Sequence, residues 1–138
     1  YNRAAVDHEI AAAIAQAVKD FDASLVLVGL ANGALVRAGR EKGLKTAEEF
    51  FMDRGYTDAG LLMPRNLPGA LIEDEDYAIE RVKQVIGTGT LKTASGTTIP
   101  MAADTICVHG DTPQALAYVA RIRRELEQAG IAIMPAGA

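Results

Sequence analysis

The sequence predicts an α/β fold built on a parallel sheet, and two observations support this prediction. Helical and strand-like segments alternate along most of the 138 residues. Two of the strand-like segments are continuous apolar runs, as expected of strands buried on both faces. Alternation of this kind requires a parallel sheet whose strands are joined by helical crossovers.

The first third of the chain predicts two helices around a buried strand. Apolar residues recur at helical spacing over residues 4–21, which indicates an amphipathic helix. Residues 24–29 form a short apolar run with β-branched side chains and predict a strand. Asn32 is expected to cap the next helix, over residues 33–42, and Gly43 to end it.

The middle of the chain predicts a strand, a long loop and a third helix. Residues 48–53 are ambiguous by period, but their position after a helix and before a loop favours a strand. Residues 55–70 contain three Gly and two Pro and predict an extended loop, which in a compact domain is usually functional or disordered. A helix follows over residues 74–87, and the Gly- and Thr-rich residues 88–100 predict a small hairpin or irregular link.

The last third predicts a strand, a helix and a further strand. Residues 105–108 form a buried strand, and Thr112-Pro113 begins a helix that Gly130 ends. Residues 131–133 predict a final short strand. Two architectures fit this order: a small doubly wound sheet, or part of a barrel, since a complete barrel takes about 250 residues.

Composition narrows the possible partners and compartment. The net charge of −4 gives no electrostatic case for a nucleic acid or an anionic membrane partner. No apolar run approaches the roughly 20 residues that a membrane span needs. The lone Cys107 excludes an internal disulfide framework and a multi-cysteine zinc site, which fits a reducing cytoplasm.

Polar clusters follow two of the predicted strands, at Asp53-Arg54-Gly55-Tyr56 and at His109-Gly110-Asp111. In parallel α/β proteins, chemistry gathers where strands end and loops lead into helices. The helix after Asp111 offers free N–H groups to an anion. Both segments are therefore candidates for an active site.

Structural roles compete with these functional ones. Asp111 occupies an N-cap position, three residues before Gln114, and a simple cap is as consistent with the sequence as a catalytic carboxylate. His109 can serve in acid–base chemistry, as a metal ligand, or in neither role. Asp53 and Arg54 can pair with each other at the surface.

Three other features carry weaker signals. His8 lies on a predicted helix among charged neighbours and is expected to be exposed. Cys107 is expected to be a buried strand residue rather than a nucleophile. Residues 87–90 superficially resemble a phosphate-binding loop, but they lack the Lys and follow a helix instead of preceding one.

Several short motifs, in this order and spacing, resemble the LamB/YcsF family over nearly the whole chain. Tyr1-Asn2 is similar to the end of that family's Lys-Pro-His-Gly-x-Leu-Tyr-Asn motif. The other matching segments are Leu27-Val28-Gly29-Leu30, Asp53-Arg54-Gly55-Tyr56, Pro64-Arg65, Gly69-Ala70-Leu71-Ile72 and Cys107-Val108-His109-Gly110-Asp111.

The resemblance implies a β/α barrel with parallel strands, TIM-like and of the glycoside hydrolase/deacetylase type. Family members have roughly the 250 residues of a full barrel. We therefore expect residues 1–138 to be the C-terminal half of a single barrel domain. The N-terminal half, which holds most of the family's acidic and histidine site residues, is expected to be missing, and activity of the fragment alone is not expected.

The resemblance also implies an activity, since bacterial family members are the first of three subunits, A, B and C, of an ATP-dependent 5-oxoprolinase. The reaction opens the lactam of 5-oxo-L-proline to give L-glutamate, with ATP activating an amide that is otherwise a poor electrophile. Subunits B and C are the implied partners, in the cytoplasm. A divalent metal and a homo-oligomer are left open.

For catalysis, the resemblance favours His109, Asp111 and Asp53. His109 is the candidate proton shuttle or ligand-orienting donor. Asp111 is a candidate to orient His109, to bind the substrate amide N–H or to ligate a metal. Asp53 is the second carboxylate candidate.

For substrate binding, the candidates are Arg54, Arg65 and Tyr56. Either arginine has the fork geometry to hold a carboxylate or a phosphate, and Tyr56 can donate to a developing oxyanion. Two alternatives remain. One is a non-catalytic barrel that holds a small carboxylic acid or sugar for a partner, and the other is a metal-dependent carbohydrate deacetylase, which rests on fold type alone.

Overall fold

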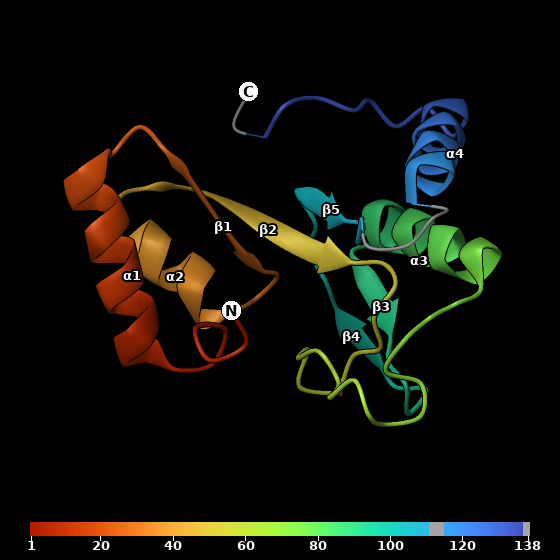
Figure 1. Ribbon diagram of the computed structural model, residues 1–138, viewed down its shortest axis with the longest axis horizontal. Coiled ribbons are helices and arrows are strands. Elements are labelled where there is room, and N and C mark those ends of the chain that lie inside the picture. The colour runs from red at the N-terminus through yellow and green to blue at the C-terminus, as the bar shows by residue number, and fades with distance from the viewer. Residues whose placement is uncertain (111–114, 137–138) are drawn as a thin grey trace.

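The computed structural model describes residues 1–110 and 115–136, which form four helices and five strands (Figure 1). Helices and strands alternate over most of this length, as the sequence predicts. In chain order the elements are α1 (His8–Phe21), β1 (Val26–Leu30), α2 (Ala34–Glu41), β2 (Lys45–Phe51), α3 (Glu75–Thr88), β3 (Thr90–Lys92), β4 (Thr98–Pro100), β5 (Thr105–Cys107) and α4 (Ala115–Gln128).

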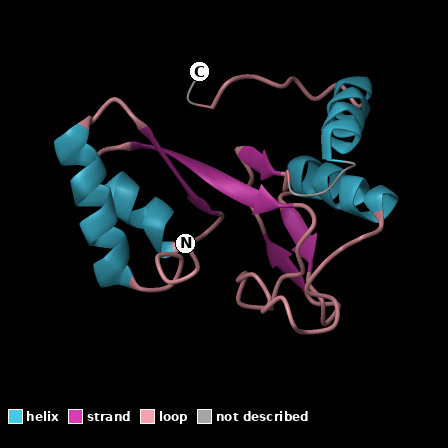
Figure 2. Ribbon diagram, viewed as in Figure 1, coloured by secondary structure: helices cyan, strands magenta, loops and turns pink. Residues whose placement is uncertain are grey.

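The main sheet has three strands in the order β1-β2-β5, and both pairings are parallel. Leu30 pairs with Glu49, and Glu49 in turn pairs with Thr105. The strands β3 and β4 form a separate antiparallel hairpin. The parallel sheet and the hairpin both confirm predictions from the sequence. Figure 2 shows α1 and α2 toward one end of the sheet and α3 and α4 toward the other.

Helices α2 and α3 cover the same face of this sheet. The helix α2 packs so closely that a Cβ added at Gly39 would lie 2.7 Å from Thr46 Cγ2 and 3.0 Å from Leu27 Cδ2. From α3, the guanidinium of Arg81 lies over the ring of Phe50, 5.4 Å from its centroid. Because side chains alternate along a strand, Thr46 and Phe50 share one face of β2.

The opposite face of the sheet, which we call the open face, carries Val28, Glu49, Phe51 and Cys107, because residues paired across parallel strands point the same way. Val28 retains 38% of its exposure although it lies in the middle of a strand. Glu49 and Cys107 are only partly buried. Hydrophobic strand residues and a carboxylate thus share an incompletely covered surface.

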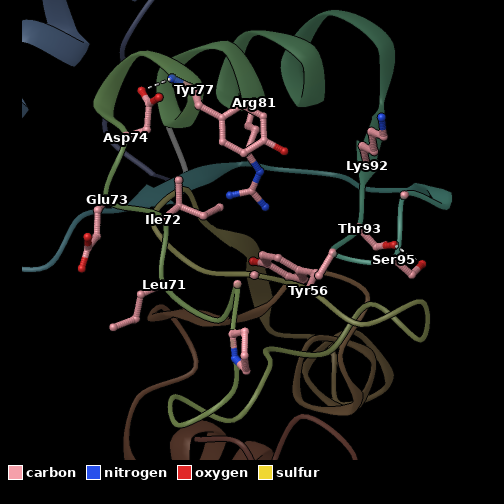
Figure 3. Close-up of a pocket in the computed structure, with 15 residues that line it drawn as sticks. Tyr56, Leu71, Ile72, Glu73, Asp74, Tyr77, Arg81, Lys92, Thr93 and Ser95 are labelled. Carbon is pink, nitrogen blue, oxygen red and sulfur yellow. Dashed lines mark hydrogen bonds between the residues drawn. The ribbon is translucent and has the colours of Figure 1, made fainter.

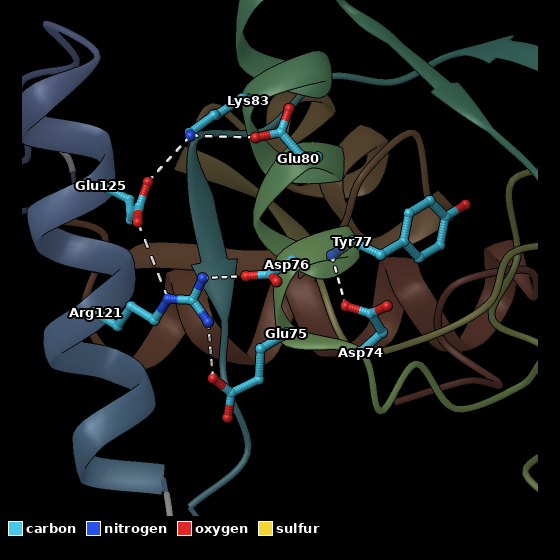
Figure 4. A network of polar contacts seen from close by, with 8 residues as sticks. All are labelled: Asp74, Glu75, Asp76, Tyr77, Glu80, Lys83, Arg121 and Glu125. Atoms are coloured by element: carbon cyan, nitrogen blue, oxygen red, sulfur yellow. Dashed lines mark hydrogen bonds and ion pairs between the residues drawn. The ribbon is translucent and has the colours of Figure 1, made fainter.

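The helices α3 and α4 are joined by ion pairs as well as by apolar packing (Figure 4). Arg121 on α4 binds Glu75 and Asp76 in the first turn of α3, and Lys83 on α3 binds Glu125 on α4 at 3.2 Å. The acidic residues stand where the positive end of the helix dipole favours negative charge. This network fixes α4 against α3, at the edge of the sheet formed by β5.

Two predictions about elements are wrong. Residues 131–133 do not form a strand; instead Ile131 packs against the main hydrophobic core, and its N–H donates to Leu126 O at 2.9 Å, which completes the end of α4. Asn32 does not cap α2. It adopts a positive φ of 60°, Gly33 takes the N-cap position, and the Asn32 amide donates to Pro100 O at 3.3 Å.

Within the described ranges, no helix is long and apolar enough to cross a membrane. The predicted start of the last helix at Thr112-Pro113 lies outside the described residues.

Candidate functional site

The two polar segments predicted from strand ends meet in the structure. Asp53 follows β2 and His109 follows β5, and these strands are neighbours in the sheet. Because the strands are parallel, their carboxyl ends lie at the same edge. The pairing of Phe51 with Cys107 places the two residues that follow each strand side by side.

Asp53 and His109 form a hydrogen-bonded pair. Asp53 Oδ2 contacts His109 Nδ1, and the two side chains keep 22% and 28% of their exposure. The second carboxylate oxygen, Oδ1, is buried and has no partner among the described residues. The imidazole is further held by the ring of Phe51, with 5.8 Å between ring centroids.

Arg65 fixes the tautomer of this pair. Its Nη2 lies 3.4 Å from His109 Nε2. A guanidinium can only donate hydrogen bonds, so Nε2 accepts and the ring proton resides on Nδ1, where it donates to Asp53. The lone pair of Nε2 therefore faces an exposed cationic side chain. For Nε2 to act as a general base, Arg65 must turn from it toward an anion, because the lone pair that would take the proton is the one to which Arg65 donates.

Sequence reasoning missed two neighbours of the pair, Glu49 and Tyr1. Glu49 Oε2 accepts a hydrogen bond of 2.6 Å from the Tyr1 hydroxyl. The Tyr1 ring packs edge-on against Phe51, and burial with the nearby Glu49 raises the pKa of its hydroxyl. The alternation of Glu49, Phe51 and Asp53 along β2 was the available signal, because residues two apart share a face.

Arg54 lies in the interior rather than beside His109. It keeps 5% of its exposure and donates to the carbonyl oxygens of Met63, at 2.6 Å, and Ala70, at 3.2 Å. These bonds hold the loop that the sequence predicted over residues 55–70. The contacts support a structural role, and the substrate-binding role of Arg54 stays a prediction.

Tyr56 is fully buried, stacks on Phe50 and accepts a hydrogen bond of 2.9 Å from the Phe51 N–H. Burial raises the pKa of its hydroxyl, with the Phe51 hydrogen bond opposing that rise. Tyr56 thus clamps the end of β2 from within the core. Its predicted hydrogen bond to an oxyanion stays a prediction.

Of the remaining candidates, Asp111 lies outside the described residues, and its role stays a prediction. Cys107 lies between Glu49 and Asp53, and burial together with these carboxylates raises its thiol pKa to about 11. That disfavours a thiolate nucleophile, as expected from the sequence. His8 is 63% exposed on α1 beside Glu41, in agreement with its prediction.

The described residues gather no metal site, and residues 87–90 do not form a phosphate-binding loop. Within residues 1–110 and 115–136, no group of three His, Cys, Asp or Glu side chains could hold a metal ion. The 87–90 segment ends α3 instead of beginning a helix, and the Thr88 hydroxyl donates to Gln84 O at 2.8 Å. It thus presents carbonyls, not the free N–H groups that bind phosphate.

Comparison with known proteins assigns the chain to a family. The model of the LamB/YcsF family matches residues 1–138, which is the entire sequence. The chain belongs to the LamB/YcsF family.

Relatives within the LamB/YcsF family share about half of their length with this chain. It is 48% identical over 133 residues to the 5-oxoprolinase A subunit of Oceanobacillus iheyensis, covering 96% of this chain and 52% of that protein. The same identity holds over 136 residues with the 5-oxoprolinase A subunit of Bordetella pertussis, covering 99% and 54%.

A solved structure shows the same arrangement of elements. The lactam utilization protein from Thermus thermophilus superposes with a TM-score of 0.83 at 37% identity, over 95% of this chain and 52% of that one. The chain thus spans about half the length of the relatives that it matches.

Proposed function

We propose that this chain is the C-terminal half of a β/α-barrel subunit of an ATP-dependent 5-oxoprolinase, which opens the lactam of 5-oxo-L-proline to give L-glutamate. One observation carries the proposal: His109 is held between Asp53 and Arg65 at the carboxyl ends of two parallel strands. Similarity to proteins named as the 5-oxoprolinase A subunit or as a lactam utilization protein supports the substrate class.

The incompletely covered open face is what part of a barrel would present. In a β/α barrel, helices cover the outside of a parallel sheet while the other face forms the interior. Here α2 and α3 cover one face, and the open face carries Val28, Glu49 and Cys107. In the full-length protein, the second half of the barrel would cover this face and supply the other wall of the site.

In the proposed mechanism, His109 acts as the general base. Its Nε2 takes a proton from the water that attacks the lactam carbonyl, while Asp53 holds the Nδ1 proton and stabilises the imidazolium that forms. The carbonyl–nitrogen bond then breaks, and the ring nitrogen leaves as the amine of glutamate. Water supplies the new carboxylate oxygen and the protons.

Arg65 binds the anion next to the base. Its guanidinium is exposed, and its described contact is with His109 Nε2. A carboxylate, as in 5-oxoproline, or a phosphate suits its two-pronged donor geometry. It also borders a cavity of about 430 Å³ together with Asn2, Leu30 and Leu62. We assign the substrate carboxylate to this end of the site.

ATP would supply activation of the unreactive amide. Since residues 87–90 do not fit a phosphate, we assign ATP chemistry to the complex with subunits B and C and derive no step from this chain. We likewise derive no step through a metal, because Asp53 and His109 already engage each other. The complex is proposed to work in the cytoplasm.

The test is glutamate release by the full-length protein combined with subunits B and C, ATP and 5-oxoproline. We expect His109→Ala to lower kcat by about 100-fold or more, the usual contribution of a positioned base. His8→Ala is the matched control, because His8 is exposed on α1, and it should retain full activity. Unchanged turnover in His109→Ala would exclude His109 as the base.

A second variant, at Arg65, tests whether the chain catalyses the reaction or only binds 5-oxoproline for a partner. Arg65→Ala is expected to raise KM for 5-oxoproline more than it lowers kcat, because it removes binding that the substrate and transition state share. If the complex turned over normally with His109→Ala while Arg65→Ala abolished 5-oxoproline binding, the non-catalytic binding barrel would be the better description.

A further inference from the structure

Arg81 is a buried cation that the proposed chemistry does not use. It lies on α3, keeps 3% of its exposure and is surrounded by the rings of Phe50, Tyr56 and Tyr77, at 5.4, 5.9 and 5.8 Å. Figure 3 shows its guanidinium pointing from α3 toward Tyr56, beside a cavity of about 700 Å³. Burial lowers the pKa of Arg81.

Fold stability alone gives a weak reason for an arginine here. Within residues 1–110 and 115–136, the carboxylate of Asp53 pairs with His109 instead of Arg81, and the buried Nε of Arg81 has no hydrogen-bond partner. Removing a charge from water is costly, and an apolar side chain of similar volume would often stabilise such a site equally well. The contacts of the guanidinium must therefore be considered one by one.

Both Nη atoms bind the backbone on either side of Asp53. Nη1 donates to Met52 O at 2.7 Å and Nη2 donates to Arg54 O at 3.0 Å. Asp53 lies beyond the end of β2, where the parallel ladder has ended and Arg54 forms an isolated antiparallel bridge with Leu71. The Asp53 carbonyl accepts from the Ile72 N–H at 2.9 Å. The rigid fork thus holds the peptide group that precedes Asp53 and the one that follows Arg54, and the Ile72 N–H holds the peptide group between them.

We propose that Arg81 is a positioning residue that acts through Asp53: it holds the carbonyl groups of Met52 and Arg54, on either side of Asp53, so that the carboxylate meets His109 Nδ1. This inference rests on the proposed function of the Asp53–His109 pair. The electrostatic attraction between Arg81 and Asp53 also helps to hold Asp53 in place. Arg81 contacts neither His109 nor the substrate side of the site in the described structure, so its influence should depend on Asp53.

The decisive experiment is a double-mutant cycle in the full-length protein with its partner subunits. Lysine keeps the charge but cannot reproduce the fork, so Arg81→Lys should lower kcat roughly 10- to 100-fold with KM changed less than about threefold. Asp53→Asn should lower kcat as well. In the Asp53→Asn background, Arg81→Lys should cost less than about twofold, since the group through which Arg81 acts is already lost.

The outcomes separate this inference from the proposed function. If Asp53→Asn has no effect, the proposed function fails. If Asp53→Asn is impaired but Arg81→Lys is normal, or if the two losses simply multiply, the positioning role is wrong. Arg121→Lys is the control, because it perturbs a surface arginine that binds Glu75 and Asp76, and it should leave kcat unchanged.

A second variant addresses folding. Arg81→Gln retains one amide donor without the buried charge and should also lower kcat without raising KM. Circular dichroism and thermal melts give the folded fraction by which kcat is normalised. If both Arg81→Lys and Arg81→Gln failed to fold, Arg81 would be required for the fold as a whole, and the positioning proposal would be overturned.

Discussion

The thiol of Cys107 is kept protonated by its surroundings. Burial makes the largest contribution, and the charges of Glu49 and Asp53 add to it, so that the pKa rises to about 11 from the ordinary value of 9.0. A thiolate at this position would add a third negative charge to the carboxyl end of the sheet. The neutral thiol instead serves as a small partly buried side chain.

We expect iodoacetamide to label Cys107 slowly at pH 9 and to react faster only as the pH approaches about 11. The unfolded chain titrates lower, so the contribution of this proton to stability is present below pH 9 and is lost as the pH rises toward the folded value. The labelling rate against pH, in native buffer and in urea, measures both values. If the labelling rate depended on pH in the same way in native buffer and in urea, the prediction would be wrong.

Two glycines within helices, Gly39 and Gly87, differ in what surrounds them and can be compared as a matched pair. A Cβ at Gly39 on α2 would lie 2.7 Å from the β-branched Thr46, whereas a Cβ at Gly87 on α3 would have no neighbour within 4 Å. Gly39 thus sets the distance between α2 and the sheet, while Gly87 makes no comparable contact.

We expect Gly39→Ala to destabilise the protein by about 1–3 kcal/mol, as overpacking usually does. Gly87→Ala should be neutral or stabilising by up to about 1 kcal/mol, because alanine has the higher helix propensity. Urea unfolding of both variants under one set of conditions gives the comparison. Equal effects would show that α2 can move away from β2 at little cost.

The sequence predicted the helices better than the strands because helical periodicity is local. The apolar spacing placed α1 and α3 to within a few residues. The polar start of β2, Lys45 to Glu49, lacks a clear period and becomes a strand by pairing with β1. Conversely, residues 131–133 have β-branched side chains but no strand partner in the described structure, and Ile131 is needed in the core instead.

The candidate site was predictable where it depends on strand order and unpredictable where it depends on loops. Parallel strands bring Asp53 and His109 to one edge, so their meeting follows from the α/β pattern. Arg65 reaches His109 from within a long loop, and Arg81 reaches the carbonyls of Met52 and Arg54 from a helix. Contacts of that kind depend on tertiary packing, which no local pattern encodes.

The whole molecule is asymmetric about its sheet. Helices α2 and α3 cover one face, while Val28, Glu49 and Cys107 lie on the open face. A parallel sheet is ordinarily covered on both faces. The chain also spans about half the length of its LamB/YcsF relatives. Together these facts support the proposal that the open face is the interior of a barrel completed by the rest of a longer protein.

This proposal makes Val28 an interior residue of the full-length protein, although it is 38% exposed here. Val28→Lys should then destabilise the full-length protein by about 3 kcal/mol or more, since it would bury an unpaired charge. The control is Ile14→Lys on α1, where the exposure is nearly the same at 36%, and where lysine can extend into solvent with a loss below about 1 kcal/mol. Thermal or urea unfolding of the two full-length variants measures the difference. If Val28→Lys were as mild as Ile14→Lys, the open face would remain exposed to solvent in the full-length protein, and the barrel proposal would have to be abandoned.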